Sequence, residues 1–386
     1  MRRSQLRVEL PPPAPDALAH SARLRERMRA EIQAHGGAIS FERYMDLALF
    51  APGLGYYSAG ARKFGAAGDF VTAPELSPLF GRCLAVQCAE LLKLLGGGDV
   101  LELGAGSGAM AADLLAELET LGTLPERYWI LEVSAELRER QRLTLTERAP
   151  ALLQRVHWLE RLPAAFSGVI LGNEVLDALP VSRFRRAVRG FEEYCVADRD
   201  GELVWQLRPA SADLQSALAA LEADLSQPLA AGYSSEICLR LPLLIASLAD
   251  ALTRGALLFT DYGYTRAGYY HPERHMGTLM CHYCQRVHDD PFLYPGLQDI
   301  TAHVDFTAMT HAATQAGLTL AGYTTQAHFL LALGIAERGV DLYTAREVKL
   351  LTLPEEMGER FKAIGFVKGM DSALRGFSLR DLSHSL

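Results

Sequence analysis

The chain has 386 residues, of which 49% are hydrophobic and 22% are charged, and its formal net charge at pH 7 is −8. This composition is typical of a globular protein that buries a large core. The sequence contains no long run of Lys or Arg, so the negative charge argues against a general binder of nucleic acid or of anionic membranes. A small cationic target remains compatible with an acidic protein.

No uninterrupted apolar segment approaches the length of a membrane span, so no membrane insertion is expected. Prolines crowd residues 11–15, where a signal peptide would need its apolar segment. We therefore expect a cytoplasmic location for a bacterial-type chain, and a mitochondrial one if the chain is eukaryotic. The six cysteines are scattered, and Cys281 and Cys284 form a lone CxxC that we interpret as a free pair rather than a zinc or redox site.

The N-terminal part of the chain predicts few regular elements. We expect an extended tail over residues 1–20 and a helix over 20–35 that ends at Gly36-Gly37. Residues 38–80 are rich in Gly, Pro and aromatic residues, and the segments 51–58 and 68–78 within them are loop-like. A longer helix over residues 78–95 ends at three consecutive glycines.

Strands and helices alternate from residue 98 onward. The expected strands cover residues 98–103, 127–133, 156–159 and 168–173, and the helices between the first three cover 107–118 and 134–148. This alternation predicts an α/β, Rossmann-like fold, with a mostly parallel sheet that carries helices on both faces.

The second half of the chain is less regular. It predicts a hairpin over 181–210 with Asp200-Gly201 as its turn, helices over 211–225, 239–253, 303–316 and 341–351, and apolar strands over 256–263 and 361–367. Residues 264–300 have little periodicity and resemble a functional loop or lid. We therefore divide the chain into an N-terminal tail, helix and cap (1–80) and a core (81–386) with insertions near 181–255 and 264–305.

A glycine-rich turn follows the first strand of this alternation. Gly104, Ala105, Gly106 and Gly108 lie between the apolar strand that contains Glu102 and the next helix, where backbone N–H groups are available to a ligand. The pattern fits a dinucleotide loop and an S-adenosylmethionine (AdoMet) loop. Glu102 favours AdoMet, because it would repel a pyrophosphate but attract the ammonium of AdoMet, directly or through a water.

The next strand ends in a second acidic residue. Glu132 lies at the tip of that strand, where a carboxylate commonly holds the ribose hydroxyls of a nucleoside, and Val133 follows it. Because NAD and AdoMet both contain ribose, this position supports a nucleoside cofactor without separating the two.

Together these landmarks resemble the MidA family, which includes the mitochondrial complex I assembly methyltransferases. The segments that carry the resemblance are GYYS (55–58), GDFVTAPELSPLFG (68–81), LELGAGSGAM (101–110), LGNEVLDALP (171–180), FTDYGY (259–264), RVHDDPF (286–292), QDITAHVDF (298–306) and LPEEMGERFKAIGFVKG (353–369). The resemblance implies a class I AdoMet-dependent methyltransferase fold. It also implies methylation of a protein arginine, with a subunit of respiratory complex I (NADH dehydrogenase) as the family's target. The loop over 280–285 departs from the expected pattern, which weakens the assignment of the target.

Carboxylates follow the fourth strand of the alternation, at the end where ligands of open sheets bind. We expect Glu174 to hold the guanidinium of the arginine, because a carboxylate matches its planar fork. Asp177 is either the second carboxylate or a cap of the following turn, and Asn173 is a candidate AdoMet contact. Glu174 also resembles in position the substrate-holding glutamate of better-known arginine methyltransferases.

Other polar and aromatic residues have two interpretations each. Asp261 ends a core strand and is either a substrate contact or a structural acceptor, and His288 with Asp289 and Asp290 forms either a proton acceptor set or a loop anchor. A group upstream of the core either closes over the methionine end of AdoMet or packs as a cap, and its members are Tyr56, Tyr57, Asp69, Phe70, Thr72 and Ser77.

The sequence leaves several functions open. The favoured hypothesis is a protein arginine methyltransferase with a protein partner that presents an arginine. The alternatives are a methyltransferase that acts on a small molecule or on another side chain, a non-catalytic assembly factor that binds AdoMet, and, as the weakest, an NAD oxidoreductase. No metal ligand set is expected, and the oligomeric state is not predicted.

Overall fold

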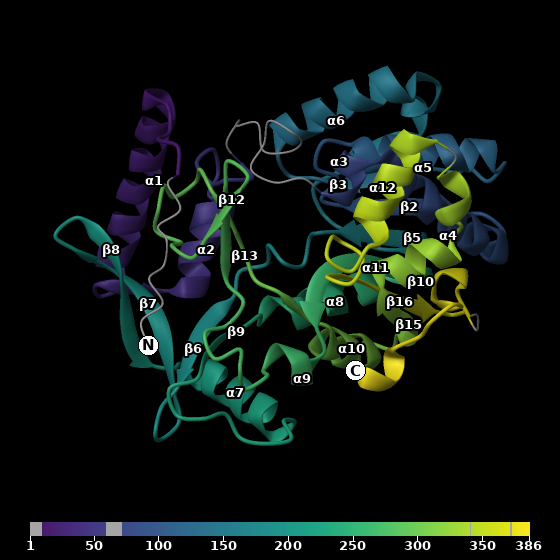
Figure 1. The fold of residues 1–386 in the computed structure, drawn as a ribbon. Coiled ribbons are helices and arrows are strands. Elements are labelled where there is room, and N and C mark those ends of the chain that lie inside the picture. Colours follow the sequence, from purple (N-terminus) through teal and green to yellow (C-terminus); the bar gives the residue numbers. More distant parts are fainter. Residues whose placement is uncertain (1–9, 59–71, 340, 371–372) are drawn as a thin grey trace. The chain divides into compact units, whose positions relative to one another are not determined.

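The computed structural model describes residues 10–58, 72–339, 341–370 and 373–386, drawn in colour in Figure 1. The chain divides into two compact units: residues 1–71, 178–239 and 270–302 belong to unit 1, and residues 72–177, 240–269 and 303–386 belong to unit 2. The division at residue 80 that we drew from the sequence stays a prediction. Within the described ranges, every helix is too short or too polar to cross a bilayer.

Unit 2 is built on one mixed sheet. Its strands lie in the order β15-β16-β10-β5-β2-β3-β4, and β14 pairs with the end of β10. The strands from β4 to β10 are parallel, whereas β16 and β15 add an antiparallel edge. The strands are β2 (Asp99–Leu103), β3 (Tyr128–Leu131), β4 (Val156–Leu159), β5 (Phe166–Asn173), β10 (Leu252–Tyr264), β14 (Val304–Asp305), β15 (Thr319–Thr325) and β16 (Phe361–Lys368).

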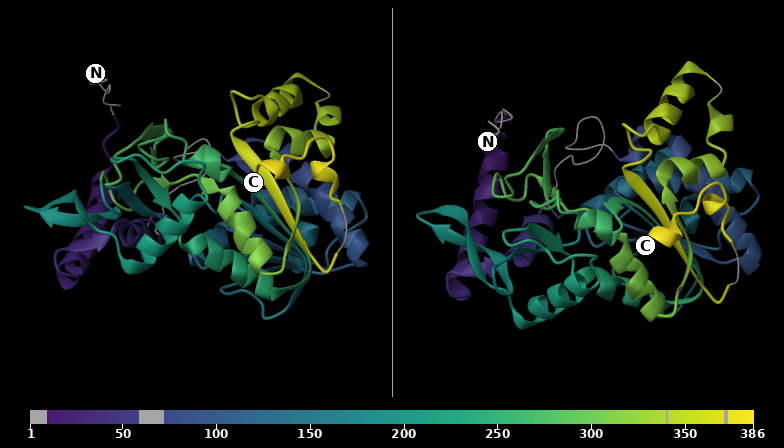
Figure 2. Two further views of the ribbon diagram at one scale, coloured as in Figure 1. Left: turned by 90° about the horizontal axis from the view of Figure 1, so that it is seen from below. Right: turned by 60° about the horizontal axis from the view of Figure 1, so that its bottom comes forward.

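Helices cover both faces of this sheet (Figures 1 and 2). The α-helices of unit 2 are α3 (Ala73–Leu76), α4 (Pro78–Leu95), α5 (Ala109–Thr120), α6 (Ala135–Arg148), α8 (Arg240–Ala251), α9 (Arg266–Tyr269), α10 (Phe306–Gln315), α11 (Gln326–Ala332) and α12 (Leu342–Thr352). Short 3-10 helices lie at η1 (Pro150–Arg155), η2 (Ala336–Arg338), η3 (Arg375–Phe377) and η4 (Ser383–Ser385). The predicted α/β fold with a mostly parallel sheet is confirmed.

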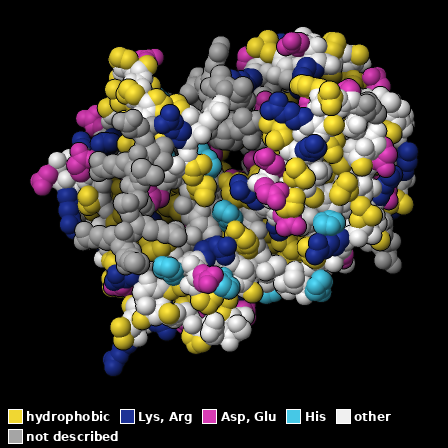
Figure 3. Space-filling view, viewed as in Figure 1, with side chains coloured by type: hydrophobic (Ala, Val, Ile, Leu, Met, Phe, Trp, Pro, Cys, Tyr) yellow, Lys and Arg dark blue, Asp and Glu magenta, His cyan; other side chains and the backbone are white. Residues whose placement is uncertain are grey.

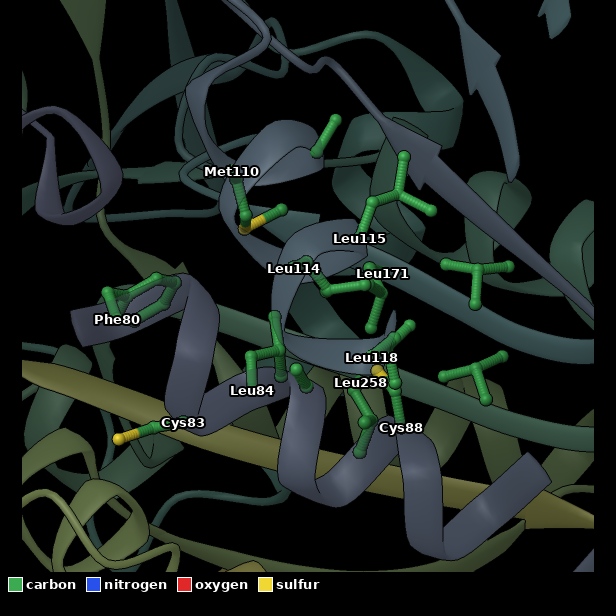
Figure 4. Close-up of a cluster of buried hydrophobic side chains, with 14 of the residues drawn as sticks. Phe80, Cys83, Leu84, Cys88, Met110, Leu114, Leu115, Leu118, Leu171 and Leu258 are labelled. Atoms are coloured by element: carbon green, nitrogen blue, oxygen red, sulfur yellow. The ribbon is translucent and has the colours of Figure 1, made fainter. Parts of the chain in front are cut away.

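The core of unit 2 explains why these segments form. Figure 4 shows leucines of α4 and α5 converging on Leu171 of β5 and Leu258 of β10, all of them buried. Residues 168–172 of β5 form a continuous buried run without polar side chains, because both faces of the sheet are covered there. Burying each such leucine contributes roughly 2 kcal/mol of hydrophobic free energy. The rigid sheet that results fixes the ends of its parallel strands.

Unit 1 contains two antiparallel sheets. One has the order β1-β7-β6-β9 with β8 paired to β7, and the other has the order β12-β11-β13. The elements are α1 (Pro15–Ala34), β1 (Ala38–Ser40), α2 (Phe41–Phe50), β6 (Ser182–Arg186), β7 (Phe191–Arg199), β8 (Glu202–Pro209), α7 (Ala212–Ala223), β9 (Ser234–Ile237), β11 (Met280–Tyr283), β12 (Arg286–His288) and β13 (Asp299–Thr301). The predicted hairpin is confirmed as β7 and β8, and its turn residues Asp200 and Gly201 have positive φ angles of 51° and 90°.

Three segments differ from the sequence-based expectation. Residues 38–50, where we predicted no helix, contain α2, an amphipathic helix that buries Phe41, Tyr44 and Met45 and carries Glu42, Arg43 and Asp46 on its opposite side. The irregular stretch over 264–300 contains β11, β12 and β13, whose three or four residues are too few to show a period. We did not predict β15, which completes the antiparallel edge of the sheet, or the helix α11 that follows it.

Acidic and basic side chains are mixed among apolar ones on the face shown in Figure 3. No continuous basic patch is visible among the described side chains of that face.

Candidate cofactor and active site

The glycine-rich turn lies at the carboxyl end of β2. Gly104, Gly106 and Gly108 have φ angles of 59°, 53° and 85°, a region that L side chains rarely adopt. A Cβ at Gly108 would lie 3.0 Å from the Cα of Gln141, and one at Gly104 would lie 3.2 Å from a methyl of Val175. These glycines therefore let the backbone of the turn lie close to its neighbours. Gly104 is exposed and Gly106 is partly exposed, whereas Ala105 between them is buried.

Glu102 lies inside the core rather than at the surface of the turn. Its side chain is 1% exposed, and its carboxylate accepts a hydrogen bond of 2.6 Å from the hydroxyl of Tyr128 on β3. Burial raises the pKa of Glu102 from 4.5 to about 7, against a smaller lowering by the Tyr128 hydroxyl. Its predicted role toward the cofactor stays a prediction, and the sequence did not reveal its partner Tyr128.

Glu132 is held at the tip of β3. Its carboxylate accepts from the backbone N–H of Ser134 at 2.9 Å and from the side-chain amide of Gln141 at 3.2 Å. The same amide donates to the carbonyl of Gly106, so Gln141 connects the predicted ribose acid to the glycine-rich turn. Burial raises the pKa of Glu132. Val133, which follows Glu132, is 76% exposed, so its apolar side chain is available to cover a bound adenine base.

Asn173 and Glu174 leave β5 in a constrained conformation. Glu174 has a φ angle of 52°, and its backbone N–H donates to the carbonyl of Thr260 on β10 at 2.9 Å. Its carboxylate accepts from the Asn173 side chain at 3.2 Å and from the backbone N–H of Ala73 at 3.3 Å. The amide oxygen of Asn173 is buried and has no hydrogen-bond partner among the described residues, which leaves an acceptor for a ligand.

Asp261 organises the turn that follows β5. One of its oxygens accepts from the backbone N–H groups of Val175, Leu176 and Asp177 at 3.2, 2.9 and 3.4 Å. Of the two interpretations of Asp261, the structure supports the structural acceptor. Burial, reinforced by the negative charges of Asp177 and Glu174, raises the pKa of Asp261 well above its usual value. Three carboxyl groups therefore gather at the carboxyl ends of β5 and β10.

Asp177 is itself fixed by an aromatic residue. The side chain of Asp177 is 5% exposed and accepts a hydrogen bond from the hydroxyl of Tyr262. The ring of Tyr262 meets the ring of His303 edge-on at 5.1 Å, and Tyr264 stacks on His303 at 5.2 Å. We did not single out Tyr262, Tyr264 or His303 from the sequence, although FTDYGY and QDITAHVDF contain them.

The short helix α3 touches two parts of this edge. Thr72 precedes α3 as its N-cap residue, and Ala73 donates to Glu174 as described above. The hydroxyl of Ser107, within the glycine-rich turn, donates to the carboxylate of Glu75. Ser77 is buried, caps α4 by accepting from the N–H of Leu79, and donates to Glu347 at 2.7 Å.

The remaining predicted residues belong to unit 1 or are not described. Tyr57 is half-buried, stacks on Phe50 at 5.5 Å and donates to Asp299 at 3.1 Å. Tyr56 is buried beside it, whereas Asp69 and Phe70 lie outside the described residues. His288 accepts from the N–H of Asp290 at 3.3 Å, a contact that favours the loop-anchor interpretation.

The two cysteines of the CxxC differ in their surroundings. Cys281 is buried in β11, and Cys284 is exposed at the turn before β12 with a φ angle of 48°. Within the described part of the chain, no group of three or more His, Cys, Asp and Glu is arranged to hold a metal ion.

Residues 83–324 match a family described as "Putative S-adenosyl-L-methionine-dependent methyltransferase". The chain belongs to this family, the MidA methyltransferases. Among curated MidA relatives, the mitochondrial protein arginine methyltransferase NDUFAF7 of Danio rerio is 31% identical over 363 residues, which cover 84% of this chain and 82% of the relative. The Mus musculus protein of the same name is 32% identical over 365 residues, which cover 84% and 80% of the two chains.

A solved structure agrees with this assignment. A crystal structure from Burkholderia thailandensis, bound to S-adenosyl-homocysteine, is 47% identical and covers 98% of this chain and 100% of its own, with a TM-score of 0.93. AdoMet as the cofactor is therefore confirmed, and the chain is an AdoMet-dependent methyltransferase. That the glycine-rich turn binds AdoMet stays a prediction. The positive φ angles of the turn and the unpartnered amide oxygen of Asn173 fit this cofactor.

Proposed function

We propose that the chain is a protein arginine N-methyltransferase. The observation that carries this proposal is the group of three carboxyl groups, Glu174, Asp177 and Asp261, at the carboxyl ends of β5 and β10. Carboxylates that lie close together in a buried place destabilise one another's charged form, and a cation among them relieves this repulsion. A guanidinium is such a cation, and it matches a carboxylate in planar geometry. The names of the curated relatives support the same substrate.

The role of Glu174 follows from its position. AdoMet, when bound, supplies a methyl group whose carbon loses its bond to sulfur as the carbon–nitrogen bond forms, which leaves S-adenosyl-homocysteine. Arginine is a poor nucleophile because its guanidinium is protonated and its lone pairs are delocalised. Glu174 holds the guanidinium and concentrates its positive charge away from the reacting nitrogen. The Ala73 and Asn173 donors fix the carboxylate in that orientation.

Asp177 supplies the second carboxylate, and Tyr262 keeps it in place. The half-exposed rings of Tyr262, Tyr264 and His303 offer faces on which a flat cation stacks favourably. The reacting nitrogen loses one proton per methyl group transferred, and the carboxylates or water accept it.

The proposed target is a protein that presents an arginine, such as a respiratory complex I subunit. The proposed location is the cytoplasm of a bacterial cell, or the mitochondrion if the chain is eukaryotic; the matched relatives are named mitochondrial. Mass spectrometry of arginine methylation in cells with and without the gene identifies the target. A complex I peptide that changes between the two samples supports this assignment.

A direct test uses labelled AdoMet and a lysate, followed by separation by size. We expect label on a protein, and hydrolysis of that protein should release methylated arginine. Glu174→Gln keeps the shape but removes the charge, so it should retain AdoMet binding and lose at least about 99% of transfer. Glu119→Gln, at an exposed site of α5, is the matched control.

The other outcomes distinguish the remaining hypotheses. Label in a low-mass fraction would contradict a protein substrate and favour a small molecule. Full rescue of a cellular phenotype by Gly106→Val, which should not bind AdoMet, would favour a non-catalytic assembly factor.

A further inference from the structure

The methionine end of AdoMet needs a partner for its ammonium. Glu132 marks the ribose side of the site at the tip of β3, and the strand order β3-β2-β5 places Asn173 on the other side of the glycine-rich turn. The amino-acid part of the ligand therefore extends from the turn toward β5. The carboxylate of Glu102 does not face this region, because it is buried against Tyr128.

Another carboxylate does lie at this place. Ser107 stands between the second and third glycines of the turn, and its hydroxyl donates to Oε1 of Glu75. Ala73 lies two residues before Glu75 in α3, and its backbone N–H donates to Glu174, which follows Asn173 at the end of β5. α3 thus runs between the turn and the end of β5, over the path that the amino-acid part of AdoMet must take.

We propose that Glu75 accepts the ammonium of AdoMet. Glu75 is partly exposed, and its second oxygen, Oε2, has no hydrogen bond or ion pair with any residue that the structure describes. The bond from Ser107 fixes the carboxylate at the turn and leaves Oε2 for a charged donor. A hydrogen bond between an ammonium and a carboxylate is among the stronger ones in proteins, especially where water is excluded.

This role depends only on the use of AdoMet and not on the identity of the methyl acceptor. A failure of the arginine proposal would leave it untouched. Glu75 also differs from Glu132, because the ribose that Glu132 is expected to hold is present in every adenosine derivative. Glu75 should therefore distinguish ligands that differ only in the amino group.

The test measures binding by calorimetry with two ligands. One is S-adenosyl-homocysteine, and the other is its deaminated analogue, in which hydrogen replaces the ammonium. The wild-type protein should bind the first at least about tenfold more tightly than the second. Glu75→Gln can still accept the Ser107 bond, and it should reduce this preference to about threefold or less while it binds the deaminated analogue as the wild type does.

Two variants separate this role from a merely structural one. Ser107→Ala removes the bond to Glu75 but keeps the charge, so the preference for the ammonium should persist. Glu132→Gln should weaken both ligands equally, because both carry the ribose. The melting temperature of each variant shows whether a change in binding comes from a loss of stability.

The proposal is overturned if Glu75→Gln keeps the wild-type preference, or if it weakens both ligands by the same factor. It is also overturned, without any variant, if the wild-type protein binds the two ligands equally well.

Discussion

The buried carboxyl of Glu102 makes the stability of the protein depend on pH in a specific way. Its pKa in the folded chain is about 7, against 4.5 for an ordinary glutamate, because burial penalises the charged form. Between these two values the folded state holds a proton that the unfolded state has lost. The free energy of unfolding therefore falls as the pH rises from 4.5 through 7.

The size of the effect follows from the shift in pKa. One pKa unit corresponds to about 1.4 kcal/mol, so the shift of Glu102 is worth about 3 kcal/mol across that range. Glu102→Gln removes the titration and keeps an oxygen that can accept the Tyr128 hydroxyl. Relative to the wild type, the variant should gain about 3 kcal/mol of stability between pH 4.5 and pH 8.

Urea unfolding at several pH values measures this difference. Trp129 and Trp158 lie in the same sheet as Glu102 and report on it by fluorescence. Every other titrating group is shared by the two proteins, so their difference isolates Glu102. Glu119→Gln, at an exposed site, should show no such trend. A difference between Glu102→Gln and wild type that stays constant within about 1 kcal/mol from pH 5 to pH 8 would refute the argument.

Three further substitutions test other parts of the site. Gly108→Ala forces a side chain to a φ of 85° and 3.0 Å from Gln141, so the protein should lose about 1 kcal/mol and bind AdoMet more weakly; an unchanged melting temperature and affinity would argue against a close approach. Tyr262→Phe removes the hydroxyl bond to Asp177, and kcat should fall at least about threefold with AdoMet affinity retained; calorimetry and turnover check the two halves separately. Asp261→Ala leaves three backbone N–H groups without their acceptor and should cost about 3 kcal/mol or more in chemical denaturation, whereas a loss within about 0.5 kcal/mol would show that water replaces it.

Local sequence patterns were sufficient to predict the glycine-rich turn and the strands that lead into the site. Glycines at positive φ and apolar runs of strand length are properties of neighbouring residues, so the turn at Gly104 and the strands before Glu132 and Asn173 could be predicted from the chain alone. In a parallel sheet the carboxyl ends of strands share one edge, which places the residues that follow them together. The helix α2 also carries a local pattern, because Glu42, Arg43 and Asp46 share the side opposite its buried residues, and our sequence analysis missed it.

The sequence determined that this protein is an α/β methyltransferase with a glycine-rich turn, since these features depend on spacing and backbone freedom. Only the tertiary structure decided which carboxylates face the site. The side chain of a strand residue points into the core or toward a ligand according to what packs against it, and Glu102 lies in the interior against Tyr128. Glu75 belongs to α3, which is separate in sequence from the glycine-rich turn, and its carboxylate accepts a hydrogen bond from Ser107. Asp261 likewise orders the turn after β5 across 84 to 86 positions of the chain, a contact that no local pattern encodes.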